Sequence, residues 1–262
     1  MFIIGELING MYKDIGRAIK EKDKAAIQKC AIEQIKCGAD ALDVNCGPAS
    51  RDPVSDIRWL IETIQEVTGN PLSIDSSKPQ VIEAGLKVLK NKAIINSVTA
   101  DPEKLEIIVP LAKKYNAKLI GLTISAKGIP QNKDMRLELA AAIVASCADQ
   151  GFGVEDLYLD PIVMPVNVAQ AQMRDILEVI RECKIISDPS PKTIVGLSNV
   201  SQGACSRSLI NRTFLTMAIA FDLDAAILDP KDLDLMDAAI TAELILNKQI
   251  YCDSYLNAYR KK

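Results

Sequence analysis

Residues 72–89 read LSIDSSKPQVIEAGLKVL, and this stretch contains the unit from which the chain is built. Leu72–Asp75 alternates apolar and polar residues, which predicts a short β-strand. Lys78–Leu89 then carries apolar residues at helical spacing. Because side chains alternate along a strand, the two apolar residues share the face toward the helices, and Ser73 and Asp75 share the other face. The stretch therefore predicts a strand with an acidic carboxyl end, followed by a helix.

The same unit recurs along all 262 residues. The predicted strands are Phe2–Leu7, Ala41–Asn45, Leu72–Asp75, Ala93–Asn96, Leu119–Ile124, Leu157–Asp160, Thr193–Leu197 and Ala225–Leu228. The predicted helices are about 14–37, 54–67, 78–89, 102–115, 135–150, 170–186, 210–221 and 233–246. Eight strands, each followed by a helix, predict an α/β fold of the (β/α)₈ TIM-barrel type. In such a barrel, Ser73 and Asp75 point inward.

A doubly wound parallel sheet has the same alternation of strands and helices. It would more often carry a glycine-rich phosphate-binding turn after the first strand, whereas the turn here reads Gly5-Glu6-Leu7-Ile8-Asn9-Gly10. The length alone allows one large domain or two small ones. No linker, low-complexity stretch or shift in composition divides the chain, so residues 1–262 are predicted to form a single domain.

Composition excludes several classes of function. Hydrophobic residues make up 48% and charged residues 25% of the chain, so a sizeable core is available and disorder is not expected. The net charge of −3 and an aromatic content of 4% argue against nucleic acid and anionic membranes as partners. The chain has no histidine, which excludes Ser-His-Asp and Cys-His catalysis and every metal site that contains histidine.

The cysteines and the amino terminus indicate a cytoplasmic protein. The seven cysteines are irregularly spaced and no two form a CxxC pair, so scattered reduced thiols are favoured over a zinc or iron–sulfur site. The first residues, Met-Phe-Ile-Ile-Gly-Glu, lack the pattern of a signal peptide, and no run of about 18 apolar residues occurs. We therefore expect a soluble protein in the cytoplasm.

Polar residues follow most of the predicted strands. They are Glu6 and Asn9, Asp43 and Asn45, Asp75 and Ser76, Asn96 and Ser97, Asp160, and Ser198 and Asn199. A single aspartate in such a position is usually a turn residue or a helix cap. Carboxylates and carboxamides at six strand ends are harder to explain structurally, and chemistry in these barrels collects at the carboxyl ends of the strands. The set predicts a polar pocket rich in hydrogen-bond acceptors.

Three kinds of ligand can be compared with this pocket. Phosphate fits poorly, because no glycine-rich turn or lysine follows the last two strands. A hard metal ion could use Asp43, Asp75 and Asp160 as oxygen ligands, although no lysine or histidine base accompanies them. An uncharged heterocycle fits better, since a carboxylate accepts two parallel hydrogen bonds from a ring N–H and a neighbouring amino group. The edge of a pterin has these donors, so a pterin without a bound metal is the favoured ligand.

Seven segments occur in the following order: Gly5–Asn9, Leu42–Asn45, Ser73–Ser76, Ile95–Ser97, Leu157–Pro161, Gly196–Gln202 and Leu209–Phe214. Together they resemble the methyltetrahydrofolate:corrinoid-protein methyltransferases, which are pterin-binding barrels of anaerobic one-carbon metabolism. The chain is also similar to the folate-binding module of cobalamin-dependent methionine synthase and, more distantly, to dihydropteroate synthase. The segment Gly196-Leu197-Ser198-Asn199-Val200-Ser201-Gln202 is the most discriminating.

The resemblance implies roles for individual residues. Asp75, Asn96 and Asp160 would hold the pterin edge, with Glu6 and Asn9 lining the same end of the barrel. Asn199 would lie next to N5, the nitrogen that carries or receives the methyl group. Flanking the folate and the face on which the corrinoid docks would be Gly196, Ser198, Gln202 and Arg207. The resemblance also implies a homodimer and a separate corrinoid carrier protein as partner.

Methyl transfer from N5 requires that a proton reach N5, because a tertiary amine leaves readily only when N5 gains positive charge, and the reverse transfer uses the same groups. Without histidine, the expected network consists of Asn199, Asp75 or Asp160 and ordered water. The direction of transfer belongs to the pathway and is not set by these residues. Two alternatives remain: a condensation like that of dihydropteroate synthase, which would need cationic strand ends for pyrophosphate, and a folate-binding protein without catalysis.

Overall fold

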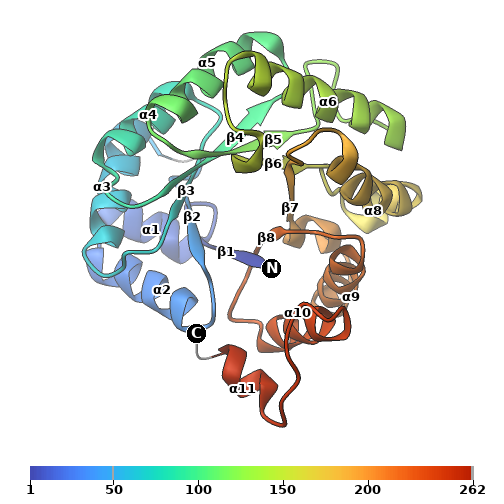
Figure 1. Ribbon diagram of the computed structural model, residues 1–262. Helices are drawn as coiled ribbons and strands as arrows, with labels where there is room; N and C mark the ends of the chain where they lie inside the picture. The colour runs from blue at the N-terminus through green and yellow to red at the C-terminus, as the bar shows by residue number, and fades with distance from the viewer. Residues whose placement is uncertain (49, 261–262) are drawn as a thin grey trace.

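A computed structural model describes residues 1–48 and 50–260. Eight parallel strands form one closed barrel, in which each strand pairs with its neighbours in chain order and β8 pairs with β1. In Figure 1 these strands surround the centre and the helices form the outer ring. The strands are β1 Phe2–Asn9, β2 Ala41–Asn45, β3 Leu72–Asp75, β4 Ala93–Thr99, β5 Lys118–Leu122, β6 Leu157–Asp160, β7 Lys192–Gly196 and β8 Ala225–Leu228. The predicted (β/α)₈ TIM barrel is confirmed.

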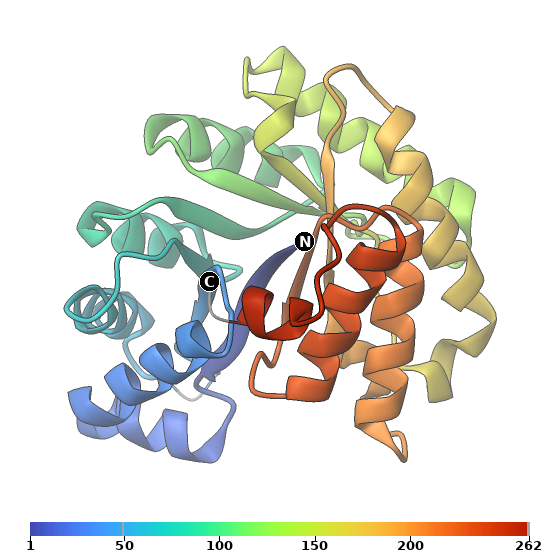
Figure 2. The ribbon, with the colours of Figure 1, turned by 60° about the horizontal axis from the view of Figure 1, so that its bottom comes forward.

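The helices alternate with the strands around the outside of the barrel (Figures 1 and 2). Their bounds are α1 Lys13–Glu21, α2 Lys24–Lys36, α3 Pro53–Gln65, α4 Pro79–Val88, α5 Pro102–Lys114, α6 Lys133–Asp149, α7 Val166–Ala169, α8 Met173–Glu182, α9 Arg207–Ala220, α10 Leu233–Ile245 and α11 Tyr255–Arg260. Proline at the start of α3, α4 and α5 suits the first helical turn, whose N–H groups have no partner inside the helix.

The single helix predicted over about 14–37 is wrong, because the structure divides this segment into α1 and α2. Lys22 adopts a left-handed conformation with φ of 56° and ends α1. Asp23 then caps α2, and its side chain accepts a hydrogen bond from Ala26 N. An aspartate that accepts from the backbone three residues later is a typical helix start. The apolar periodicity continues through this break, so periodicity alone did not reveal it.

Two further differences from the sequence prediction affect whole elements. The segment predicted as one helix over 170–186 consists of a 3₁₀ turn over Gln170–Gln172, then α8, and then a second 3₁₀ turn over Cys183–Ile185, and the short helix α7 precedes it. The C-terminal helix α11 was not predicted. In Figure 2 it is the red helix close to the start of the chain, and it is the last element of the described residues. Neither difference alters the barrel.

The barrel has two apolar cores. The larger core lies between the strands and the surrounding helices and includes Leu42, Ile74 and Leu159. The smaller core fills the barrel itself and consists of Ile4, Ala41, Ile94, Ile120, Tyr158, Ile194 and Ala225. Side chains alternate along each strand, so residues two positions away from a member of this smaller core also point toward the barrel axis.

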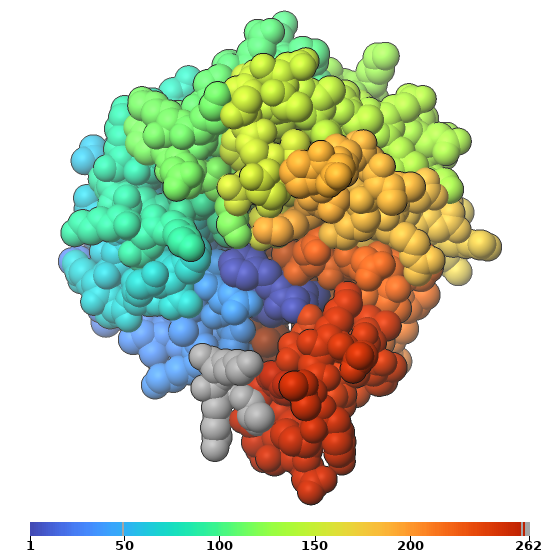
Figure 3. Space-filling view, in the orientation of Figure 1, coloured from blue at the N-terminus to red at the C-terminus, as the bar shows by residue number. Residues whose placement is uncertain are grey.

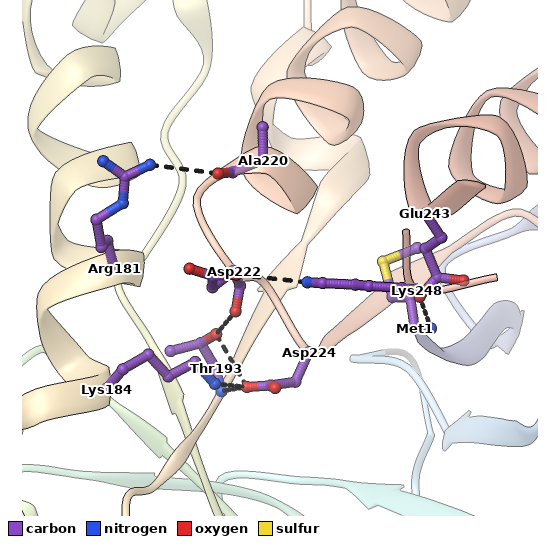
Figure 4. A network of polar contacts seen from close by, with 9 residues as sticks. All are labelled: Met1, Arg181, Lys184, Thr193, Ala220, Asp222, Asp224, Glu243 and Lys248. Carbon is purple, nitrogen blue, oxygen red and sulfur yellow. Dashed lines mark hydrogen bonds and ion pairs between the residues drawn. The ribbon is translucent and has the colours of Figure 1, made fainter. Parts of the chain in front are cut away.

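The N-terminal ends of the last strands are joined by polar contacts (Figure 4). Asp224 Oδ2 accepts hydrogen bonds from Thr193 N at 2.6 Å and Thr193 Oγ1 at 3.2 Å, and it also pairs with Lys184. The amino group of Met1 pairs with Glu243 nearby. The space-filling view shows a hollow between the blue start of the chain and the red C-terminal segment (Figure 3). This end of a TIM barrel contributes to stability, and the chemistry is expected at the other end.

Candidate active site

The carboxyl ends of the strands carry a polar layer above the apolar barrel core. Two residues beyond this core, on the same face of the strand, the side chain is polar or absent on five strands, whereas Leu122 on β5 and Ile227 on β8 remain apolar. The five positions are Glu6, Asp43, Asn96, Asp160 and Gly196. Asp75 occupies the corresponding position above Ser73 on β3. The structure therefore brings polar side chains from five strands, together with Gly196 of a sixth, to the end of the barrel where the sequence predicts the pocket.

Asp43 on β2 links the side chains of three neighbouring strands. Its Oδ1 accepts hydrogen bonds from Ser73 Oγ on β3 at 2.6 Å and from Asn96 Nδ2 on β4 at 3.1 Å. Two residues further along β2, Asn45 Nδ2 donates to Asp75 Oδ2 at 2.6 Å. Asp75 and Asn96 face each other in the β3–β4 register. Two of the predicted pterin-binding residues are thus adjacent, and Asp43 and Asn45 orient their side chains.

The two carboxyl groups on β2 and β3 disfavour ionisation together. Burial raises the pKa of Asp43, and repulsion from Asp75 raises it further, against hydrogen bonds from Ser73 and Asn96 that lower it. Burial likewise raises the pKa of Asp75, against the hydrogen bond from Asn45. All of these donors are neutral, so the state in which one of the two carboxyl groups is protonated is favoured over the doubly ionised state. A ligand that brings N–H donors would stabilise the ionised form of the pair.

Asp160 at the end of β6 is held by backbone groups. Its Oδ1 accepts a hydrogen bond from Ile162 N at 2.8 Å, and its own carbonyl accepts from Thr123 N at 3.0 Å. Burial raises its pKa to about 7, while the N–H groups of Ile162 and Gly196 lower it. Asp160 is 9% exposed. It is therefore largely buried, and a ligand at the mouth of the barrel can still reach it. A carboxyl group poised near neutrality suits proton exchange.

Glu6 and Ser198 join the first strand to the segment after β7. Ser198 Oγ donates to Glu6 Oε1 at 2.7 Å across 192 residues of sequence. Burial raises the pKa of Glu6, and Ser198 and Arg207 lower it. Burial and the nearby Glu6 together raise the pKa of Tyr12 to about 12, so this phenol remains protonated and can donate. The contact anchors the rim of the pocket on the side away from Asp75.

The segment after β7 places Asn199 and Arg207 at the rim. A 3₁₀ turn over Leu197–Ser201 leaves Asn199 exposed and buries Ser201. Arg207 Nε donates to Ser201 Oγ at 3.2 Å, which ties the first residue of α9 back to the turn. Gln202 is exposed and makes no side-chain contact that the structure records. Exposed polar groups beside a buried acceptor pocket are accessible to a docked partner.

Asn9 differs from the other predicted site residues. Its Oδ1 accepts a hydrogen bond from Met11 N at 2.9 Å, within the turn that follows β1. This is the ordinary turn role of an asparagine. Its amide nitrogen remains available, so a role at the pocket stays a prediction.

Asp43 and Asn45 lie outside the predicted pterin-binding set, and the sequence offers Asp43 only as a candidate metal ligand. The signal was present in the sequence, because Leu42-Asp43-Val44-Asn45 alternates in the same way as Leu72–Asp75. Applied to β2, the alternation turns both polar residues inward. Their hydrogen bonds to Ser73, Asn96 and Asp75 could not be read from the sequence.

The alternative of a metal ion can be examined in the same residues. Among residues 1–48 and 50–260, no group of three or more cysteine, aspartate or glutamate side chains is arranged to hold a metal ion. The aspartates of β2 and β3 are instead bonded to serine and asparagine donors. The expectation that no metal is required stays a prediction. In the same described residues, no helix is long and apolar enough to cross a membrane.

Comparison with known proteins adds an independent line of support. The family model described as "Pterin binding enzyme" matches residues 13–229. A methylcorrinoid:tetrahydrofolate methyltransferase from Eubacterium limosum is 30% identical over 100% of this chain and 97% of its own length. A methionine synthase from Mycobacterium tuberculosis is 27% identical over 87% of this chain, which corresponds to 20% of the synthase.

Solved structures of low sequence identity share the fold. A 7,8-dihydropteroate synthase from Vibrio fischeri has a TM-score of 0.67 at 17% identity and covers 95% of this chain and 94% of its own. A DHPS from Yersinia pestis, solved with a pterine-sulfa conjugate, has a TM-score of 0.65 at 14% identity and covers 94% of each chain. At these identities the likeness supports the barrel architecture and nothing more specific.

Proposed function

The chain belongs to the pterin-binding enzyme family, and we propose that it is a methyltransferase acting between N5 of tetrahydrofolate and the cobalt of a corrinoid. The observation that carries this proposal is the full-length similarity to the Eubacterium limosum methylcorrinoid:tetrahydrofolate methyltransferase. That similarity extends over the polar strand ends and the rim segment around Asn199. We further propose that residues 1–262 form one such barrel domain.

The pocket has the hydrogen-bonding character that a pterin requires. In this proposal Asp75 and Asp160 accept hydrogen bonds from ring N–H and amino groups, and Asn96 both donates and accepts. Asp43 holds Asn96 in place through the 3.1 Å contact. Glu6, Asn9, Gly196 and Ser198 line the pocket, and Gln202 and Arg207 flank the opening. Supporting this arrangement is the placement of Asp75, Asn96 and Asp160 on the inward face of their strands.

Proton movement at N5 is assigned to Asn199 and the buried aspartates. When the methyl group leaves methyltetrahydrofolate, the N5–carbon bond breaks and N5 must take up a proton, and the reverse transfer releases one. Asn199 can contact N5 more strongly as charge develops there, which favours the transition state over the ground state. Asp160, with its pKa raised to about 7, is suited to exchange the proton through ordered water.

The corrinoid is proposed to arrive on a separate carrier protein, and when bound it supplies the cobalt that donates or accepts the methyl group. The chain contains no histidine that could serve as an imidazole ligand to that cobalt. Asn199, Gln202 and Arg207 are exposed at the rim, where a docked carrier could reach the folate. The direction of transfer is left to the pathway.

Two finer proposals accompany the main one. We propose that the chain forms a homodimer, as its family resemblance implies. A surface groove of about 640 Å³ between α8 and α9, lined by Leu177, Leu209, Phe214 and Met217 among others, offers an apolar contact for a second copy. Sedimentation at micromolar concentration tests this directly.

The seven unpaired cysteines also fit a reducing compartment, and we propose that the protein acts in the cytoplasm.

The decisive test is anaerobic mixing of the protein with methyltetrahydrofolate and reduced cobalamin. Formation of methylcobalamin, followed by its absorption spectrum, is the expected result. Folate binding without methyl transfer to cobalamin or to a corrinoid protein would favour a carrier without catalysis. Condensation of a pterin pyrophosphate with p-aminobenzoate, in place of methyl transfer, would favour the dihydropteroate-synthase-like alternative.

A further inference from the structure

Arg136 on α6 is fully buried, with 0% of its surface exposed. Its guanidinium makes three hydrogen bonds, all to neutral oxygens: Nε to Pro161 O at 2.9 Å, Nη2 to Gln172 Oε1 at 2.7 Å and Nη1 to Asn132 O at 3.4 Å. Burial lowers its pKa, against the attraction of Asp175. A buried charge is costly, and apolar residues of similar volume often serve stability as well or better. Packing alone therefore does not explain an arginine at this position.

Arg136 has two backbone contacts, and the shorter one is to Pro161 O, one residue beyond Asp160. Pro161 begins the turn in which Asp160 Oδ1 accepts from Ile162 N at 2.8 Å. Ile162 has φ of +63°, a left-handed conformation that β-branched residues rarely adopt. Such a conformation persists only where the surroundings enforce it. By fixing the carbonyl of Pro161, Arg136 holds the turn that presents the Ile162 N–H to Asp160.

A second pair of hydrogen bonds holds the same turn, from Thr123, the residue that follows β5. Thr123 is also fully buried, and both its backbone N and its Oγ1 donate to the carbonyl of Asp160, at 3.0 and 3.1 Å. The carbonyl of Asp160 is thus held by Thr123, and the carbonyl of Pro161 is held by Arg136. Both of these side chains are buried. The carboxylate of Asp160 remains directed at the pocket and makes no ion pair in the structure's described residues.

We infer that Arg136 is a positioning residue for Asp160, acting through Pro161 and the Ile162 turn and without contact to the substrate. This inference rests on the proposed function, in which Asp160 contacts the pterin. The inference predicts two separate effects. Loosening the turn should change the environment of the Asp160 carboxyl even without folate, and it should impair folate recognition when folate is present.

The test compares R136M and R136K with the wild type, and V144A serves as a matched control. Val144 is buried on the same helix and packs in the larger core, so V144A lowers stability without touching the turn. The first readout is the titration of Asp160 by NMR of carboxyl-labelled aspartate in folate-free protein. Loss of the Ile162 hydrogen bond should raise the Asp160 pKa in R136M, whereas V144A should leave it unchanged.

The second readout is folate affinity by calorimetry. R136M should weaken binding roughly 10- to 100-fold, because the loss of one hydrogen bond to a charged group has effects of this size. R136K keeps a charged donor that can reach one carbonyl, so it should recover part of the loss. T123V, an isosteric change, should shift the Asp160 titration in the same direction and to a smaller extent; it decides the question if R136M does not fold.

The outcomes separate the two proposals. An Asp160 titration that is unchanged in R136M, or in T123V where R136M fails to fold, overturns the positioning role. A shifted titration in a protein whose wild type binds no folate would leave the positioning role standing and overturn the proposed function. A loss of affinity that is equal in R136M and V144A would assign the effect to general destabilisation and overturn the inference.

Discussion

The side chain of Asn199 lies over Gly196. Asn199 Nδ2 is 3.0 Å from the point where a Cβ on Gly196 would stand, which is closer than ordinary van der Waals contact. Gly196 is the last residue of β7 and faces into the barrel, and Asn199 lies in the turn that follows. The missing side chain at residue 196 therefore leaves room for the Asn199 amide to fold back toward the pocket.

Gly196→Ala should slow methyl transfer by displacing Asn199. The new methyl group requires the Asn199 amide to move, and an exposed amide can do so with little cost to folding. We expect the rate to fall roughly 10-fold or more, since misplacement of a reacting group by less than 1 Å is costly, while the free energy of unfolding changes little. Rapid-mixing kinetics and urea denaturation provide the two measurements.

Gly69→Ala is the matched control for that substitution, because a Cβ at residue 69 meets no atom within 4 Å. It should leave the transfer rate unchanged. A double variant provides a second check. If Gly196→Ala acts through Asn199, it should add little to the loss already caused by Asn199→Ala. Additive losses would mean that the methyl group obstructs the pterin itself.

Asp75→Asn should weaken folate binding without weakening the fold. Replacing a carboxylate that faces N–H donors costs about 1.5–3 kcal/mol of binding free energy. The same change removes the repulsion between Asp75 and the buried Asp43, and an asparagine oxygen can still accept from Asn45. Calorimetry and thermal unfolding should therefore move in opposite directions. Unchanged affinity would return Asp75 to the role of a turn residue.

The barrel could be predicted from sequence because its signal is local. Alternation along Leu72–Asp75 and helical spacing along Lys78–Leu89 each involve only neighbouring residues, and the unit repeats eight times. The break between α1 and α2 was missed because Lys22 carries no sequence sign of its φ of 56°. Lysine adopts this conformation rarely, and here the following cap at Asp23 accompanies it.

The site was predicted in part for a similar reason. The inward direction of Asp75 and Asp160 follows from alternation, and the resemblance to a family supplied their roles. The contact between Glu6 and Ser198 spans 192 residues, and no local pattern encodes it. Arg136 was not singled out because it lies on a helix, and its bond to Pro161 depends on how α6 packs beside β6.

Removal of metal ions should leave activity unchanged. The acidic strand ends are proposed to bind a heterocycle, and Asp43 and Asp75 are bonded to Ser73 and Asn45. Exhaustive dialysis against a chelator, followed by the methylcobalamin assay in metal-free buffer, measures this. Activity lost on chelation and restored by Mg²⁺ or Zn²⁺ would show that the aspartates hold a metal ion.

Asp160 should make the folded protein less stable as the pH rises. Its pKa is raised by burial from 3.8 to about 7, so between these values the folded chain binds a proton that the unfolded chain has released. The free energy of unfolding therefore falls as the pH rises through this window, by at most about 4 kcal/mol for this group. Asp160→Asn should be more stable than the wild type at pH 8 and nearly equal at pH 4.

Urea denaturation at several pH values tests this, with Asp149→Asn as the control. Asp149 is exposed at the end of α6, so its replacement controls for the loss of one aspartate carboxyl group outside the pocket. An Asp160→Asn curve parallel to that of the wild type would mean that the carboxyl group ionises normally in the folded chain. Its assignment to proton exchange at N5 would then lose its support.

Asn199→Ala should separate catalysis from binding. If the amide contacts N5 mainly as charge develops there, its removal should slow methyl transfer far more than it weakens folate binding. A loss of about 10²-fold in the rate constant is expected, by comparison with other single groups that stabilise developing charge. The folate dissociation constant should change much less, because Asp75, Asn96 and Asp160 remain in place. The loss should also depend on pH, since protonation of N5 is what the contact supports. Rapid mixing and equilibrium titration of the same variant give both quantities. An equal loss in rate and affinity would make Asn199 an ordinary binding residue, and proton delivery would then fall to Asp160, whose pKa near neutrality suits it to that role.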